Sequence, residues 1–136
     1  MIRPIVRDPL FLSQKSVPAD ERDRQTITDL LDTLRANLDR CVGMAANMIG
    51  VRKRIIVFCC GPFQVVMVNP QIIAGTGEYE TEEGCLSLTG VRKTRRYKKI
   101  TVKYLDRDFH PGTGSYEGFT AQIIQHEIDH CDGILI

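Results

Sequence analysis

Aliphatic residues near the beginning of the chain recur at the three- and four-residue spacing of an amphipathic helix. They are Ile27, Leu30, Leu31, Leu34 and Leu38. With Asp20 as N-cap and acidic residues in the first turn, this pattern predicts a helix over residues 21–38 that packs one apolar face on the core. Residues 2–17 are interrupted by prolines, which predicts an extended arm.

Farther along, the pattern shortens to the two-residue period of β-strands. Residues 54–60 and 63–69 are rich in β-branched and aromatic residues, and Gly61-Pro62 between them predicts a hairpin. Residues 71–74 extend the predicted sheet up to the next pair of glycines. Residues 91–105 contain a further alternating strand.

The chain returns to a helical pattern near its end. Thr120 is expected to cap a helix over residues 121–131, and Gly133 stands where that helix would end. The order of elements predicts one α+β domain over residues 1–136. Small mixed or antiparallel sheets would pack around this last helix, with an additional helix near the N-terminus.

The composition is that of a globular protein. Of 136 residues, 43% are hydrophobic and 26% are charged, and the formal net charge is +1. This near-balance argues against disorder and against a nucleic-acid partner, so the basic residues 92–99 are interpreted as a solvated strand face rather than an RNA contact. Short apolar runs and a polar beginning predict a cytoplasmic protein without a signal peptide or a membrane contact.

The last predicted helix contains an H-E-x-x-H motif. His126 and His130 lie one turn apart on one helix face, so both rings can reach one metal ion, while Glu127 can contact an activated water without binding the metal. The motif also occurs by chance in surface helices. Here it holds two of only three histidines, and its apolar neighbours indicate a buried helix in which these polar groups need partners.

A third metal ligand is expected upstream, because only six residues follow His130. Cys85, preceded by Gly84, can present a thiolate and leave the fourth position of the metal open to water. Taken alone, Cys85 would be interpreted as a buried apolar residue. An odd count of five cysteines and the absence of a secretion signal argue against a disulfide framework.

Three segments together resemble the peptide deformylase family, metalloenzymes that remove the formyl group from N-formylmethionyl peptides. Residues 42–50 resemble its G-x-G-x-A-A-x-Q-x-G segment, residues 83–87 match E-G-C-L-S, and residues 125–130 match Q-H-E-x-D-H. The resemblance spans nearly the whole chain.

The resemblance implies a role for each motif residue. Cys85, His126 and His130 would bind one divalent metal ion, with iron(II) expected natively and zinc, nickel or cobalt also compatible with these ligands. Glu127 would act as general base and then as general acid. The backbone N–H of Leu86 would stabilise the oxyanion formed from the formyl carbonyl.

The resemblance also implies a peptide site. Its residues would be Val42, Gly43, Gly84, Arg92, Phe119, Gln122 and Ile123. Main-chain groups of Val42 and Gly84 would pair with an extended peptide, and the residues from the last helix would line a pocket for methionine. Glu83 and Arg96 would form an ion pair that holds the cysteine loop. Proximity to the ribosome is implied by the substrate and not by any basic patch.

The first motif departs from the family at two positions. Cys41 replaces its first glycine, and Met48 replaces a glutamine whose amide donates to the oxyanion. Losing such a donor costs about 10²–10³ in turnover. The neighbouring Asn47 is expected to point to the opposite face of an extended chain.

Three hypotheses therefore stand. The chain is an active deformylase, or a metal-binding paralogue that binds methionyl peptides with weak or no turnover, or an H-E-x-x-H protease of another family. The complete E-G-C-L-S segment argues against the third, and the resemblance favours the first.

Overall fold

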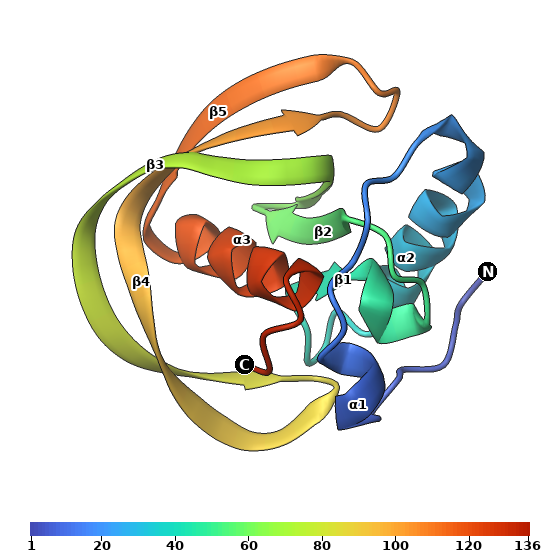
Figure 1. Ribbon diagram of the computed structural model, residues 1–136, viewed down its shortest axis with the longest axis horizontal. Helices are drawn as coiled ribbons and strands as arrows, with labels where there is room; N and C mark the ends of the chain where they lie inside the picture. Colours follow the sequence, from blue (N-terminus) through green and yellow to red (C-terminus); the bar gives the residue numbers. More distant parts are fainter.

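Two long, curved strands wrap around the last helix of the chain (Figure 1). The computed structural model describes residues 1–136. Its elements, with η for a 3-10 helix, are α1 (Pro9–Leu12), η1 (Glu21–Asp23), α2 (Arg24–Ala36), β1 (Gly43–Ala45), η2 (Ala46–Ile49), β2 (Ile55–Cys60), β3 (Phe63–Cys85), β4 (Leu88–Leu105), β5 (Pro111–Glu117) and α3 (Gly118–Cys131). The strands form one five-stranded antiparallel sheet in the order β1-β2-β3-β4-β5. The predicted α+β class is confirmed, with one sheet instead of several small ones.

The N-terminal part of the chain follows the predicted pattern with one correction. Asp20 caps the helical segment, since its carboxylate accepts the Arg22 N–H at 2.9 Å, and η1 leads directly into α2. The prediction that residues 2–17 are wholly extended is wrong, because α1 forms within them. Asp8 caps this short helix by accepting the Leu10 N–H at 3.0 Å, and Pro9 occupies its first position, where no N–H is needed.

The predicted hairpin of β2 and β3 is confirmed, but β3 continues to Cys85 beyond the two glycines. Gly75 is a position of close packing and not a turn. A Cβ atom there would lie 2.7 Å from the ring of Tyr97 on β4. The Tyr97 ring on β4 therefore packs over Gly75 of β3, and the pairing of the two strands continues past this glycine.

The other differences lie around β5 and the beginning of α3. β5 is not predicted from the sequence, because its glycines and small polar residues lack an alternation of apolar residues. The strand nevertheless pairs with β4 along its whole length. Thr120 does not cap α3, because the helix begins earlier, at Gly118. Gly118 has a φ of 64°, a left-handed conformation that glycine adopts at little cost.

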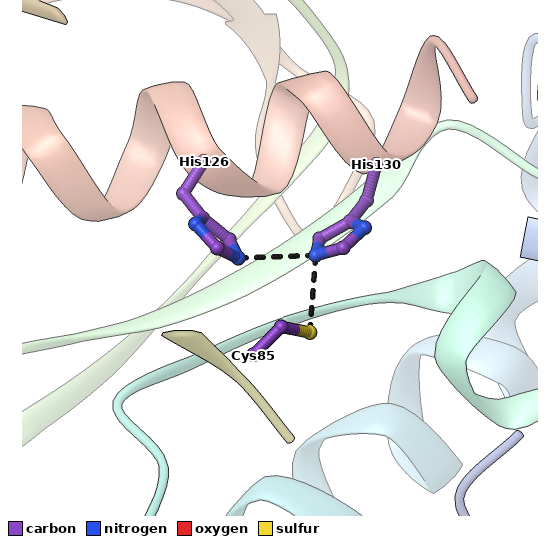
Figure 2. Close-up of side chains that lie close together, drawn as sticks. All are labelled: Cys85, His126 and His130. Atoms are coloured by element: carbon purple, nitrogen blue, oxygen red, sulfur yellow. Dashed lines mark hydrogen bonds between the residues drawn. The ribbon is translucent and has the colours of Figure 1, made fainter. Parts of the chain in front are cut away.

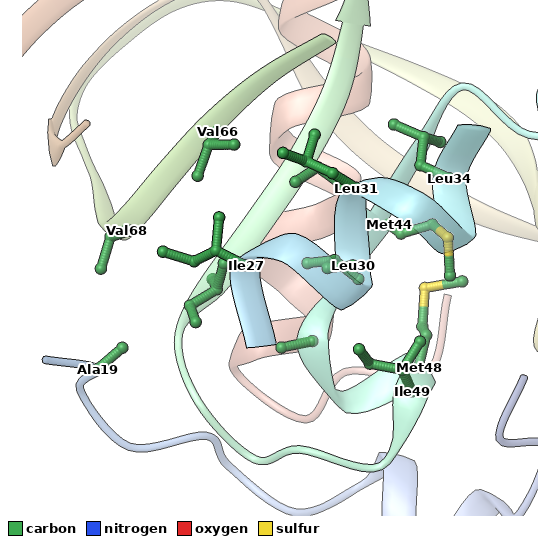
Figure 3. Close-up of a cluster of buried hydrophobic side chains, with 13 residues drawn as sticks. Ala19, Ile27, Leu30, Leu31, Leu34, Met44, Met48, Ile49, Val66 and Val68 are labelled. Carbon is green, nitrogen blue, oxygen red and sulfur yellow. The ribbon is translucent and has the colours of Figure 1, made fainter. Parts of the chain in front are cut away.

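Both faces of the central sheet are covered by helices. Ile55 and Val57 of β2 pack in a cluster with α2, whereas Ile56 and Phe58 pack with α3 on the opposite face. Figure 3 shows the first cluster, in which the apolar stripe of α2 meets Met44 and Met48. This packing fixes α3 in the interior of the molecule and buries its polar motif.

The basic run on β4 is mostly a solvated face, as predicted. Lys93 and Arg95 are exposed and lie opposite Glu82 and Glu80 of β3. Arg96 is the exception, because it is 4% exposed and points into the protein. Among the helices of this fold, none combines the length and apolarity needed to cross a membrane.

Candidate metal centre and peptide cavity

Three potential metal ligands converge where the end of β3 meets α3 (Figure 2). His126 and His130 project from one face of α3 with their Nε2 atoms 3.1 Å apart. The Sγ atom of Cys85 lies 3.2 Å from Nε2 of His130. All three ligand atoms lie within 4.8 Å of one another. The sequence therefore identified a set of side chains that the fold brings together.

The spacing and chemistry of these atoms fit a divalent transition-metal ion. Two ligands that are each about 2.1 Å from a tetrahedral ion lie about 3.4 Å apart, close to the 3.1 and 3.2 Å that separate His130 from His126 and from Cys85. Nδ1 of His126 lies 2.8 Å from Oε1 of Glu83, which directs the lone pair of Nε2 toward the cluster. The Ser87 N–H donates to the Cys85 sulfur at 3.4 Å, so a backbone donor also faces this ligand atom.

A buried ion-pair network holds this centre, and it includes the predicted pair of Glu83 and Arg96. The Arg96 guanidinium lies 2.7 Å from a Glu83 oxygen on β3 and 2.7 Å from an Asp129 oxygen on α3. Burial alone would raise the pKa of the Glu83 carboxyl, but hydrogen bonds from His126, Arg96 and Gln122 lower it to about 2. Glu83 is therefore a stable carboxylate that orients the His126 ring.

Glu127 has a different environment from its neighbour Glu83. Its side chain is buried beside the ligands, and its Oε1 atom has no hydrogen-bond partner. Burial raises the pKa of Glu127 to about 7, although the charge of His126 opposes the shift. A carboxyl group with a pKa near neutrality can both accept and return a proton, which is what general acid–base chemistry requires.

A cavity of about 270 Å³ opens beside Cys85, His126 and Glu127. Seven residues proposed for catalysis or substrate line its wall: Val42, Gly43, Gly84, Leu86, Phe119, Gln122 and Ile123. Arg92 does not line it, although it pairs with Glu83 in the β3–β4 register. The lining residues of the cavity come from the segment that leads into β1, from the end of β3 and the turn after it, and from α3.

Gly43 allows β1 to approach α3 closely. A Cβ atom at this position would lie 2.7 Å from Cγ2 of Ile123 and 3.0 Å from an oxygen of Glu127. Only a residue without a side chain fits there unless the helix residues move. This contact explains in physical terms why the motif has a glycine at position 43.

Met48, one of the two departures in the first motif, and its neighbour Asn47 are both buried. The Met48 side chain is 1% exposed, packs in the apolar cluster of Figure 3 and does not line the cavity. Asn47 is not in an extended segment as expected, since it belongs to η2. Its Nδ2 donates to the backbone carbonyl of His130 at 2.9 Å, so this amide already has an acceptor.

Three further residues beside the site were missed by sequence reasoning. Cys41 and Arg40 line the cavity, and Arg7 donates from Nη1 to the carbonyl of Leu86 at 2.8 Å. Burial raises the pKa of Cys41 to about 12, so its thiol is protonated and its S–H donates to the Gly43 carbonyl. The only sequence signal was the proximity of Arg40 and Cys41 to the first motif.

Known proteins resemble this chain over its whole length. The family model for polypeptide deformylase matches residues 2–136. The chain is 60% identical to a peptide deformylase of Clostridium beijerinckii over 136 residues, which is 100% of both chains. A crystal structure of a peptide deformylase from Legionella pneumophila has a TM-score of 0.89 at 40% identity, covering 99% of this chain and 83% of that one.

A second solved structure, a class I type b peptide deformylase from Acinetobacter baumannii, has Met-Ala-Ser bound. Its TM-score is 0.86 at 31% identity, and the match covers 99% of this chain and 97% of that one. These matches agree with the motifs and with the Cys/His/His cluster beside the cavity. The chain belongs to the polypeptide deformylase family.

Proposed function

We propose that this protein is a metal-dependent peptide deformylase in which Cys85, His126 and His130 bind the metal and Glu127 transfers protons. The observation that carries the proposal is the convergence of three suitable ligand atoms beside a cavity that Glu127 also lines. When bound there, a divalent ion supplies Lewis acidity toward a carbonyl oxygen and increases the acidity of water. The reaction is hydrolysis of the N-formyl group, which releases formate.

The residues of this chain then perform separate steps. Glu127 accepts a proton from the water that attacks the formyl carbon, and it returns a proton to the amine nitrogen as the C–N bond breaks. The backbone N–H of Leu86 donates to the oxygen that becomes negatively charged. Glu83 keeps the His126 ring in place throughout, because Arg96 and Gln122 stabilise its carboxylate.

The cavity provides the binding site for the methionine residue of the substrate. Phe119, Gln122 and Ile123 line it from α3. Val42 and Gly84 also line it, and their main-chain groups would pair with a peptide backbone. The bound Met-Ala-Ser in the Acinetobacter baumannii enzyme supports a peptide of this kind as ligand. Arg92 lies on β4 opposite Glu83 and would contact peptide residues farther from the methionine.

Iron(II) is the proposed native ion, with zinc, nickel or cobalt as alternatives that the same ligands accept. The proposed substrates are N-formylmethionyl nascent chains, which places the enzyme in the cytoplasm and near the ribosome. No observation favours the alternative of a binding protein with weak or no turnover.

Formate release tests the proposal. Protein purified anaerobically and loaded with iron or nickel should release formate from formyl-Met-Ala-Ser, whereas a Cys85→Ser variant should lose both bound metal and most activity. Metal bound at full occupancy without any formate release would contradict the proposed reaction. Full metal occupancy in Cys85→Ser would contradict the proposed ligand set.

A further inference from the structure

A second groove adjoins the peptide cavity near Cys85. Its wall consists of Arg7, Arg40, Gly84, Cys85, Leu86 and Gly90. Arg40 and the segment from Gly84 to Leu86 also line the peptide cavity, so the groove and the cavity share these lining residues. A peptide that leaves the cavity past Gly84 therefore enters a groove bordered by two arginines.

Both guanidinium groups are anchored by neutral hydrogen-bond acceptors. Arg7 donates to the Leu86 carbonyl at 2.8 Å. Arg40 donates from Nη2 and Nε to Oδ1 of Asn37, at 2.9 and 3.2 Å. Asn37 is itself buried and donates to the carbonyl of Thr33 at 2.7 Å. The two positive charges are thus held in position at the groove.

Neither arginine forms an ion pair, in contrast to Arg3, Arg22, Arg54, Arg95 and Arg96. Neither Asp8, which caps α1 through the Leu10 N–H, nor Glu82, which lines the peptide cavity together with Arg40, forms an ion pair with them. Two unneutralised cations beside one groove repel each other, and an anion between them would relieve this repulsion.

We propose that Arg7 and Arg40 form a subsite for a carboxylate side chain that follows the methionine of the substrate. The inference rests on the proposed deformylase function and specifies its substrate class. A guanidinium presents several N–H donors in one plane, which matches the two oxygens of a carboxylate. Formyl-methionyl peptides with Asp or Glu at one of the next two positions are the preferred substrates.

Matched peptides test the subsite. The substrates are C-terminally amidated formyl-Met peptides that carry Asp, Asn or Lys at the first or second position after methionine, together with the free-acid form of the Asn peptide, and all are assayed for formate release. The parent protein should prefer Asp to Asn by about two- to tenfold in kcat/KM at low ionic strength, mainly through KM, because exposed ion pairs are modest and are screened by salt. The preference should decrease at high salt.

Variants of Arg40 provide the second arm of the test. The Asp-to-Asn ratio should fall to about one in Arg40→Gln, and Arg40→Glu should prefer the Lys peptide. Arg107→Gln, in the exposed turn between β4 and β5, is the matched control and should keep the parental ratio. Formate release from the Asn peptide shows in each case that the variant is folded.

The possible outcomes distinguish a failure of the proposed subsite from a failure of the proposed reaction. Equal rates with the Asp and Asn peptides in a parent protein that releases formate would overturn the subsite and leave the deformylase function standing. A preference only for a free-acid peptide over its amide would assign the arginines to a terminal carboxylate and overturn the side-chain assignment. No formate from any peptide would overturn the proposed function and this inference with it.

Discussion

Glu127 and the two histidines share one helix turn, but their side chains have different surroundings. The Nε2 atoms of His126 and His130 meet each other and the cysteine sulfur, whereas the Glu127 carboxylate faces the cavity with one oxygen unpartnered. In Glu127→Ala we therefore expect formate release to fall by about 10²–10⁴-fold while metal content per protein stays unchanged. Formate assay and metal analysis of the same preparation check this, with the exposed Glu80→Ala as control. Loss of metal together with activity would indicate that Glu127 is a metal ligand and would contradict this prediction.

Replacing Met48 tests whether position 48 can contribute to stabilising the oxyanion. Its thioether lies in the apolar cluster and accepts the Ala45 N–H at 3.5 Å, so position 48 offers no donor to the cavity. We expect Met48→Gln to raise kcat by one to three orders of magnitude if its amide reaches the reacting oxygen. The same change should lower the free energy of unfolding by about 1–3 kcal/mol, because an amide replaces an apolar group in the core. A folded Met48→Gln variant with parental kcat would contradict an oxyanion role for this position.

At the scale of elements, Arg96 connects three parts of the fold. It extends from β4, pairs with Glu83 on β3 and with Asp129 on α3, and is almost completely buried. Replacing it leaves the buried Glu83 and the half-buried Asp129 without their counter-charge, so Arg96→Met should lower the free energy of unfolding by about 3–5 kcal/mol. Its neighbour Arg95 is 74% exposed and has one long contact to Glu80 at 3.7 Å. Arg95→Met should change stability by less than about 0.5 kcal/mol. Denaturant unfolding of both variants checks the contrast, and equal losses would contradict it.

The elements also show what the sequence can predict. The motif helix, the cap at Asp20 and the first hairpin depend on neighbours in sequence, and all three were predicted. The continuation of β3 depends on Tyr97 covering Gly75 from another strand, and β5 depends on pairing with β4 rather than on its own pattern. Arg7 and Arg40 reach the site through tertiary contacts, and local patterns of apolar and polar residues do not record such contacts.

At the scale of the whole molecule, the site depends on elements that are far apart in sequence. β3 supplies Cys85, α3 supplies both histidines and Glu127, and the segment around β1 closes the cavity. The sheet can hold them together because α2 packs on one of its faces and α3 on the other. The proposed metal centre is therefore also a tertiary contact between β3 and α3.

Metal removal should for this reason weaken the fold as well as stop the reaction. An ion that binds only the folded chain stabilises it by about 2.7 kcal/mol at a free concentration one hundred times its Kd. For a domain of this size, that corresponds to roughly 10 °C in the unfolding midpoint. Thermal unfolding followed by circular dichroism should show this decrease after chelation and its recovery when nickel is added back. Cys85→Ser, which lacks one ligand, should show a much smaller difference between the two conditions. An unchanged midpoint in the parent protein after verified metal loss would mean that the ion does not link β3 to α3.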